Sequence, residues 1–122
     1  MDTLELLLKS EPCNLPEKEV KLKRLSKECG GAVIFKLRAL TYNRVAEIKN
    51  AHAGGDMEVH ILLAGVVSPD LKSEELKKKY NAVTPAEMIK AMLLPGELED
   101  ISREIEKLSG YRITTVEEVK KK

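Results

Sequence analysis

Two short segments with alternating apolar and charged residues, one on each side of a glycine pair, constrain the fold most strongly. In EVKLKRL, residues 19–25, valine and leucine alternate with lysine, and AVIFKLRAL, residues 32–40, has the same period of two. This period predicts half-buried strands. Gly30 and Gly31 between them can adopt positive φ, so we predict a β-hairpin with a longer loop, SKECGG. A lone hairpin is only marginally stable, and helices must therefore cover its apolar face.

The segments after the hairpin supply helices. Thr41 is a predicted N-cap for a helix that runs to about Asn50, and Asp56 is a predicted N-cap for a second helix that runs to about Val67. This second helix is the most apolar segment of the chain, and we predict that it is the central core helix. Ser73 is expected to cap a short helix, EELKKKY.

The sequence TPAE at residues 84–87 is typical of a capping box with proline at the first helical position. We expect the Thr84 hydroxyl to accept from the Glu87 amide, and the Glu87 carboxylate to accept from the Thr84 amide. Pro95-Gly96 is expected to close this helix, and a last long helix then ends at Gly110. These two helices carry apolar stripes with helical spacing, formed by Met88, Ile89, Met92 and Leu93 and by Leu98, Ile101, Ile105 and Leu108.

A leucine-rich segment precedes the hairpin. Residues 3–9 can form one or two helical turns carrying Leu4, Leu7 and Leu8, but so short a helix is marginal alone and must dock on something. Residues 10–17 contain two prolines and form a predicted tether. The leucines could pack on the rest of this chain or on another protein. We favour the second possibility, and Leu4, Leu7 and Leu8 are our candidate partner-binding residues.

These patterns predict the fold class and the division of the chain. We expect an α+β, mostly helical single domain with one N-terminal β-hairpin and about five helices. Residues 1–18 form the leucine-rich segment and tether, residues 19–111 form the domain, and residues 112–122 form a charged tail. A chain of 122 residues is long enough to bury its own core without disulfides or metal.

Charge and composition disfavour several classes of function. Lys and Arg number 21 against 20 Asp and Glu, and aromatic residues make up 3% of the chain, so little is available to attract or stack on nucleic acid. The first ten residues are too short an apolar stretch for a membrane span, and Asp2 and Glu5 do not fit a basic secretory leader. We predict a protein that binds neither nucleic acid nor membrane and stays in the cytoplasm.

Candidate catalytic or metal-binding groups are few. His52, Asp56, Glu58 and His60 supply the right atoms, but Gly54-Gly55 separates the histidines, and the HExxH pattern is absent. Cys13 and Cys29 lack CxxC spacing and any neighbouring group that would activate a thiolate. We therefore predict no catalytic site, no metal and no cofactor. Several amphipathic helices without such signatures are typical of a protein-binding domain.

The order of several segments resembles the XkdN-like family of phage and prophage tail assembly chaperones. The resemblance covers most of the chain, and its most specific part is the long segment with the tyrosine, the capped helix, the Leu-Leu-Pro-Gly-Glu break and the terminal Leu-Ser-Gly. The matching segments are TLELLL, VKLKRL with FKLRALT, VVSPDL and YNAVTPAEMIKAMLLPGELEDISREIEKLSGY.

This resemblance implies a function. Proteins of the family are thought to bind the tape measure protein of the growing tail, to keep it soluble during assembly, and to be absent from the mature particle. The resemblance implies the cytoplasm of the bacterial host as the location, the tape measure protein as the partner, and the tail tube protein as a second candidate partner. It supplies no catalytic residues. A homo-oligomer is an open alternative for the assembly state, and the alternative function is that of a structural tail component, a tube or completion protein of the virion.

Overall fold

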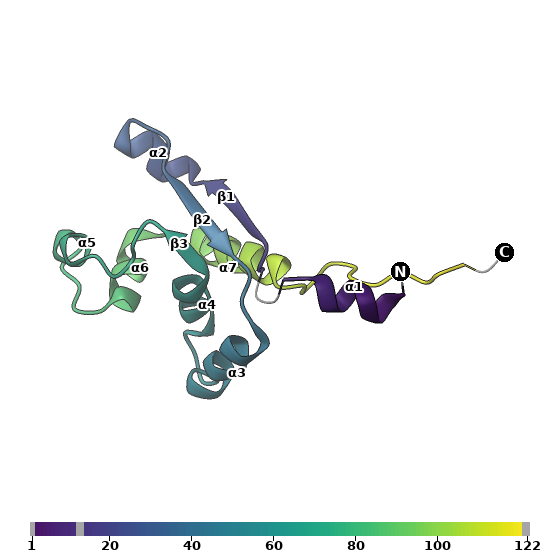
Figure 1. Cartoon of the computed structure of the whole chain (residues 1–122). Coiled ribbons are helices and arrows are strands. Elements are labelled where there is room, and N and C mark those ends of the chain that lie inside the picture. Colours follow the sequence, from purple (N-terminus) through teal and green to yellow (C-terminus); the bar gives the residue numbers. More distant parts are fainter. Residues whose placement is uncertain (1, 12–13, 121–122) are drawn as a thin grey trace.

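In the computed structural model, which describes residues 2–11 and 14–120, helices pack against one face of a small antiparallel sheet (Figure 1). The sheet has three strands in the order β1-β2-β3. The described residues form seven helices, two more than expected, and one more strand than the predicted hairpin. The elements are α1 (Thr3–Lys9), β1 (Glu17–Lys21), α2 (Lys23–Cys29), β2 (Ile34–Arg38), α3 (Tyr42–Ala51), α4 (Met57–Gly65), β3 (Val66–Ser68), α5 (Glu74–Lys79), α6 (Pro85–Met92) and α7 (Pro95–Leu108).

The predicted hairpin is present, but a helix replaces its loop. Strands β1 and β2 pair antiparallel, with Val20 opposite Phe35. The prediction of a strand over residues 19–25 is wrong in its second half, because α2 begins at Lys23. Gly30 ends this helix in the left-handed conformation with φ of 72°, and the Ser26 hydroxyl accepts from the Val33 amide at 2.8 Å. Beyond Lys21 the chain no longer pairs with β2, and the backbone groups of residues 23–29 form hydrogen bonds within α2 instead.

An arginine joins α2 to the rest of the domain. Arg24 donates to the Glu97 carboxylate at 2.8 Å and to the backbone carbonyl of Met92 at 2.9 Å. The same Glu97 carboxylate accepts from the Leu94 amide at 2.7 Å, and these hydrogen bonds hold the pKa of Glu97 below its usual value. One side chain thus ties α2 to the turn between α6 and α7.

The most apolar segment of the chain is divided between a helix and a strand. Helix α4 ends at Gly65 instead of about Val67, and residues 66–68 form β3 on the free edge of β2. Leu62 is fully buried, which confirms a central position for α4, but Val67 is exposed. Valines are well suited to a strand. The free edge of β2 supplies the backbone hydrogen-bond partners, and because β2 lies about 30 residues earlier in the chain, the local sequence pattern does not indicate this pairing.

The core lies between the inner face of the sheet and helices α4, α6 and α7. Phe35 and Leu37 of β2 point into it, as do Met88 and Ile89 of α6. Helices α4 and α7 approach closely at Gly65, where an added Cβ would lie 2.6 Å from the side chain of Ile105. The stripes predicted for α6 and α7 are therefore core, apart from the half-buried Leu108.

Most of the predicted helix starts are confirmed. The hydroxyls of Thr41, Ser73 and Thr84 accept from amides three residues further along, at 3.2, 3.4 and 3.2 Å. Two details are wrong. Glu87 accepts from the amide of Val83 instead of Thr84, and Asp56 occupies the N-cap position in the left-handed conformation without a side-chain capping bond. The Asp56 carboxylate instead accepts from Lys90 at 2.8 Å.

The last two helices are separated differently from the prediction. Helix α6 ends at Met92, and Pro95-Gly96 forms the first turn of α7 instead of a break between them. Proline fits this position because the backbone N–H of a first-turn residue has no acceptor within the helix, so the lack of an N–H in proline costs no hydrogen bond. Helix α7 ends at Leu108, and Gly110 follows with φ of 97°.

Candidate functional site

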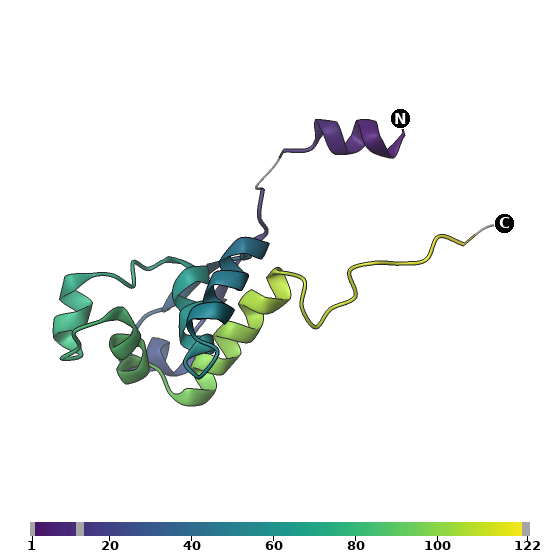
Figure 2. The ribbon, with the colours of Figure 1, turned by 90° about the horizontal axis from the view of Figure 1, so that it is seen from below.

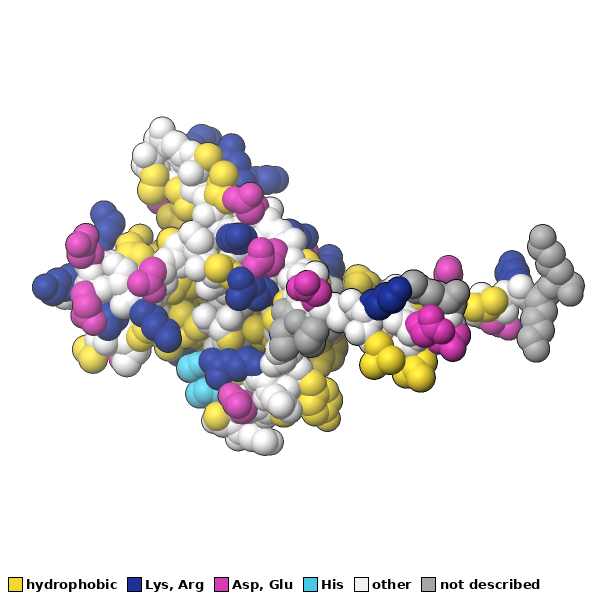
Figure 3. Space-filling model, viewed as in Figure 1, with side chains coloured by type: hydrophobic (Ala, Val, Ile, Leu, Met, Phe, Trp, Pro, Cys, Tyr) yellow, Lys and Arg dark blue, Asp and Glu magenta, His cyan; other side chains and the backbone are white. Residues whose placement is uncertain are grey.

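The three candidate partner-binding residues lie together on an exposed helix. Asp2 caps α1 by accepting from the Glu5 amide at 2.9 Å. Leu4, Leu7 and Leu8 are 64%, 65% and 75% exposed, and α1 has no buried residue. Leu6, which was not predicted, extends this apolar surface and is 56% exposed. Apolar side chains on α1 are visible in the space-filling view (Figure 3).

Helix α1 stands apart from the domain. The chain leaves it at Ser10 in an extended conformation, with φ of −68° and ψ of 151°. It reaches the domain at Pro16, whose carbonyl accepts from the Ala39 amide at 2.9 Å. Seen from two directions, α1 and the chain after α7 both extend away from the body formed by the sheet and helices (Figure 1, Figure 2). The described residues of the tail, 112–120, are exposed and carry no helix or strand.

An apolar pocket lies close to the point where the tether joins the domain. We name it the tether-end pocket; it encloses about 210 Å³. Its walls come from α3, α4, α7 and the segments beside α3 and α7. The Lys49 ammonium lies 5.7 Å from the centre of the Tyr111 ring. Met57 and Tyr111 remain partly exposed at its rim. The lining residues are Leu40, Val45, Lys49, Met57, Ile61, Glu106, Ser109 and Tyr111.

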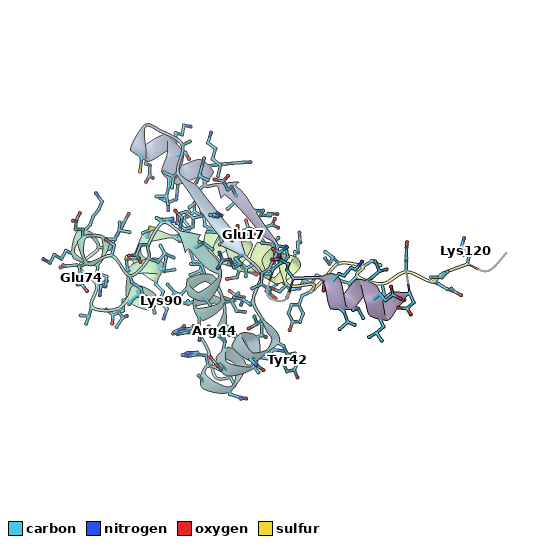
Figure 4. The ribbon with its side chains drawn as sticks, viewed as in Figure 1. Glu17, Tyr42, Arg44, Glu74, Lys90 and Lys120 are labelled. Carbon is cyan, nitrogen blue, oxygen red and sulfur yellow. The ribbon has the colours of Figure 1, made fainter. Side chains whose placement is uncertain are left out.

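A wider groove lies between α4 with β3 on one side and the start of α6 on the other. It measures about 610 Å³ and has an apolar floor that includes Leu63, Val66 and Pro85. Arg44, Asp70 and Lys72 are among the polar residues at its sides. Arg44 lies on α3, and Lys90 lies on α6 outside the lining of this groove (Figure 4). Because the groove is formed by residue 44 together with residues within 60–72 and 84–86, no local pattern in the sequence indicates it.

Tertiary structure brings the two histidines together, contrary to the expectation from the glycine pair between them. The rings of His52 and His60 stack with centroids 3.5 Å apart and an angle of 8° between their planes. Burial lowers the pKa of His60, and the neighbouring charge of His52 acts in the same direction. Glu58 is exposed, and within the described segments no three His, Cys, Asp or Glu side chains gather where they could hold a metal ion.

The cysteines are the remaining candidate groups. Cys29 is a free, exposed thiol at the end of α2, whereas Cys13 lies outside the described residues. The outward face of the hairpin carries ion pairs beside the exposed Ile34, since Glu17 contacts Arg38 at 2.7 Å and Lys36 at 3.4 Å. Both contacts lower the pKa of Glu17, with the hydrogen bond from Arg38 contributing most. None of the helices in the described segments is long and apolar enough to cross a membrane.

An exposed leucine helix together with two hollows that have partly apolar walls is typical of a protein-binding domain. Comparison with known proteins identifies the family. A sequence model of the phage XkdN-like tail assembly chaperone proteins matches residues 4–121. The chain therefore belongs to the XkdN-like family of phage tail assembly chaperones.

A solved structure has the same fold. The crystal structure of the protein YqbN is similar to this chain with a TM-score of 0.71 and 24% sequence identity, over 91% of this chain and 98% of YqbN. No curated protein matches the chain significantly.

Proposed function

We propose that this protein binds the tape measure protein of a phage tail through Leu4, Leu7 and Leu8 and keeps it soluble in the host cytoplasm until the tail tube forms around it. It acts by binding and not by catalysis, and it leaves before the particle is mature. The observation that carries the proposal is the exposed leucine surface of α1, in a chain that belongs to a tail assembly chaperone family.

The physical argument starts from what a client of this kind needs. A long helical chain without its partners exposes apolar stripes and aggregates, and a chaperone keeps it soluble by covering these stripes. A short amphipathic helix is suited to this, because its leucines can pack along an apolar stripe of a client helix. The tether lets α1 reach the client while the charged body stays in solvent.

Reversible binding also fits this design. Ordering a seven-residue helix and its tether on the client costs conformational entropy, which reduces the net affinity. The tail tube protein can then displace the chaperone by covering the same apolar stripes over a larger area. The XkdN-like family assignment supports a role in assembly, and the tape measure protein is our proposal for the client.

Coexpression with the tape measure protein of the same phage tests the proposal. We expect the tape measure protein to be soluble and to copurify with the wild-type chain. Replacing Leu4, Leu7 and Leu8 by serine should reduce the recovered complex at least about tenfold, because each buried leucine contributes roughly 1.5–3 kcal/mol. The matched control replaces two exposed tail residues, Val116 and Val119, by serine.

Two results would contradict the proposal. If the leucine variant recovers as much soluble tape measure protein as the control, the leucines of α1 do not bind the client. Mass spectrometry of purified particles supplies the second criterion: stoichiometric amounts of this chain in mature virions would identify a structural tube or completion protein instead of a chaperone.

A further inference from the structure

We propose that two copies of this protein exchange their α1 helices, each α1 packing its leucines into the tether-end pocket of the other copy. This inference goes beyond the proposed function, because it concerns the free protein before any client binds. It follows from two apolar surfaces that a single copy leaves uncovered.

The first uncovered surface is α1 itself. A helix of seven residues is marginal in water unless something packs on it. At 100° per residue its four leucines span roughly 200° of the helix circumference, which is wider than the stripe of an ordinary surface helix. A flat surface cannot cover so wide an apolar face, whereas a concave surface can.

The second uncovered surface is the tether-end pocket. Leu40, Val45 and Ile61 form its apolar walls, and Met57 at its rim is 37% exposed. Tyr42, which precedes Val45 by one helical turn, points away from the body on the side where α1 lies (Figure 4). The pocket is therefore concave and apolar, and it lies at the end of the domain from which α1 extends.

Charge is complementary as well. The polar edge of α1 carries Asp2 and Glu5 together with Lys9, and the pocket rim carries Lys49 beside the Tyr111 ring. The other charged rim residue, Glu106, is paired with Arg112 at 3.2 Å. A helix with acidic groups beside its apolar face therefore meets a lysine at the pocket edge.

The tether favours a second copy over the chain's own pocket. The carbonyl of Pro16 accepts from Ala39, directly before the pocket residue Leu40, so the tether starts beside the pocket. To fold back, α1 would have to reverse direction within residues 10–16, which include two prolines. Proline fixes its own φ and favours an extended conformation in the residue before it, and Ser10 is extended too.

A second copy receives α1 without this reversal. Exchange of an identical element gives a two-fold symmetric dimer in which both contacts form together, so each contact strengthens the other. A tether of seven residues can span at most about 25 Å, which limits how far apart the two domains can lie. In such a dimer the leucines are covered in the absence of a client, and the client competes with the second copy for them.

Sedimentation velocity over a range of concentrations tests the dimer. We expect the wild-type chain to dimerise, and Leu7→Glu and Met57→Glu each to raise the dissociation constant at least tenfold. Met57 is the first residue of α4, where a carboxylate is favourable, so this variant should fold. The control Val83→Glu changes another exposed apolar residue outside the pocket and should dimerise as wild type.

Crosslinking distinguishes the ways in which α1 could be covered. In a background with both native cysteines replaced by serine, one chain carries Leu7→Cys and another carries Met57→Cys, and a short bismaleimide is added to the mixture. We expect a crosslinked pair of the two different chains. A chain that carries both cysteines and crosslinks only within itself at high dilution would show that α1 folds back on its own pocket, and the exchange would be wrong.

The remaining outcomes also decide the question. A monomer at all concentrations, or a dimer that neither Leu7→Glu nor Met57→Glu weakens, overturns the exchange. Coexpression with the tape measure protein separates this result from the proposed function. If Met57→Glu is monomeric and still keeps the client soluble, both proposals are supported. If the wild-type chain forms no dimer and only the leucine variant loses the client, the proposed function is supported and the exchange of α1 is wrong.

Discussion

Helices α1 and α7 both carry a stripe of leucines or isoleucines, but only one of them is covered. Helix α7 has 14 residues, and its Leu98, Ile101 and Ile105 are buried against α4 and the sheet. Helix α1 has seven residues and buries none of its leucines. Both stripes indicate that a helix needs an apolar partner. The comparison shows that the stripe alone does not reveal whether the same chain supplies that partner.

Length and connection account for the difference. Helix α7 follows α6 after a two-residue turn, and Arg24 further ties this turn to α2. Helix α1 is joined to β1 by a proline-containing tether of seven residues. The short connection holds α7 against its neighbours, whereas α1 beyond the tether has no buried residue.

The largest expected effect compares the two stripes directly. Ile105→Ala should lower the free energy of unfolding by about 2–5 kcal/mol, because Ile105 is fully buried and its truncation leaves a cavity. Leu7→Ala should change it by less than about 0.5 kcal/mol. Urea denaturation followed by far-ultraviolet circular dichroism, with protein dilute enough to be monomeric, measures both. A similar loss for Leu7→Ala would mean that α1 belongs to the core.

A smaller effect on stability is expected at the close contact between Gly65 of α4 and Ile105 of α7. Gly65→Ala should destabilise the domain by about 1–3 kcal/mol, because the new methyl group would lie 2.6 Å from atoms of the buried Ile105. Gly96→Ala in the first turn of α7 is the matched control, since nothing lies within 4 Å of the added atom. It should be neutral or stabilise by up to about 1 kcal/mol. Thermal melts that rank the two variants in the opposite order would contradict the packing of α4 on α7.

The smallest effect compares the same capping bond in a packed helix and in the tethered one. Thr84→Ala removes the bond to the Glu87 amide at 3.2 Å and should cost about 1 kcal/mol of global stability. Asp2→Ala removes the bond to the Glu5 amide at 2.9 Å, but it should reduce only the local helicity of α1. Denaturation midpoints of dilute samples measure the first, and amide hydrogen exchange of residues 3–9 measures the second. A midpoint for Asp2→Ala that falls as far as that of Thr84→Ala would show that α1 folds together with the domain.

Local hydrogen bonds and helical periodicity could be predicted from the sequence because their partners lie within four residues. Thr41, Ser73 and Thr84 cap the helices that they were predicted to cap, and the stripe of α7 is core. The hairpin pairing also follows from the alternation in its two strands. The order of the segments, from the leucine-rich start to the terminal Leu-Ser-Gly, was sufficient to indicate the chaperone family.

The features that the sequence did not reveal depend on partners far away along the chain. Val66–Ser68 becomes a strand because β2 offers a free edge, and Asp56 turns from its own helix to Lys90, 34 residues away. The residues around Gly65 in the sequence do not explain why a glycine is needed there. The reason is steric, because the side chain of Ile105 leaves no space for a Cβ at this position. The stacked pair of His52 and His60 and the tether-end pocket likewise form only when α3, α4 and α7 pack. Sequence alone determined most of the helices and the apolar faces that need cover, but not α2 or β3. Tertiary structure decided which of those faces the chain covers itself, because only packing brings distant side chains into contact.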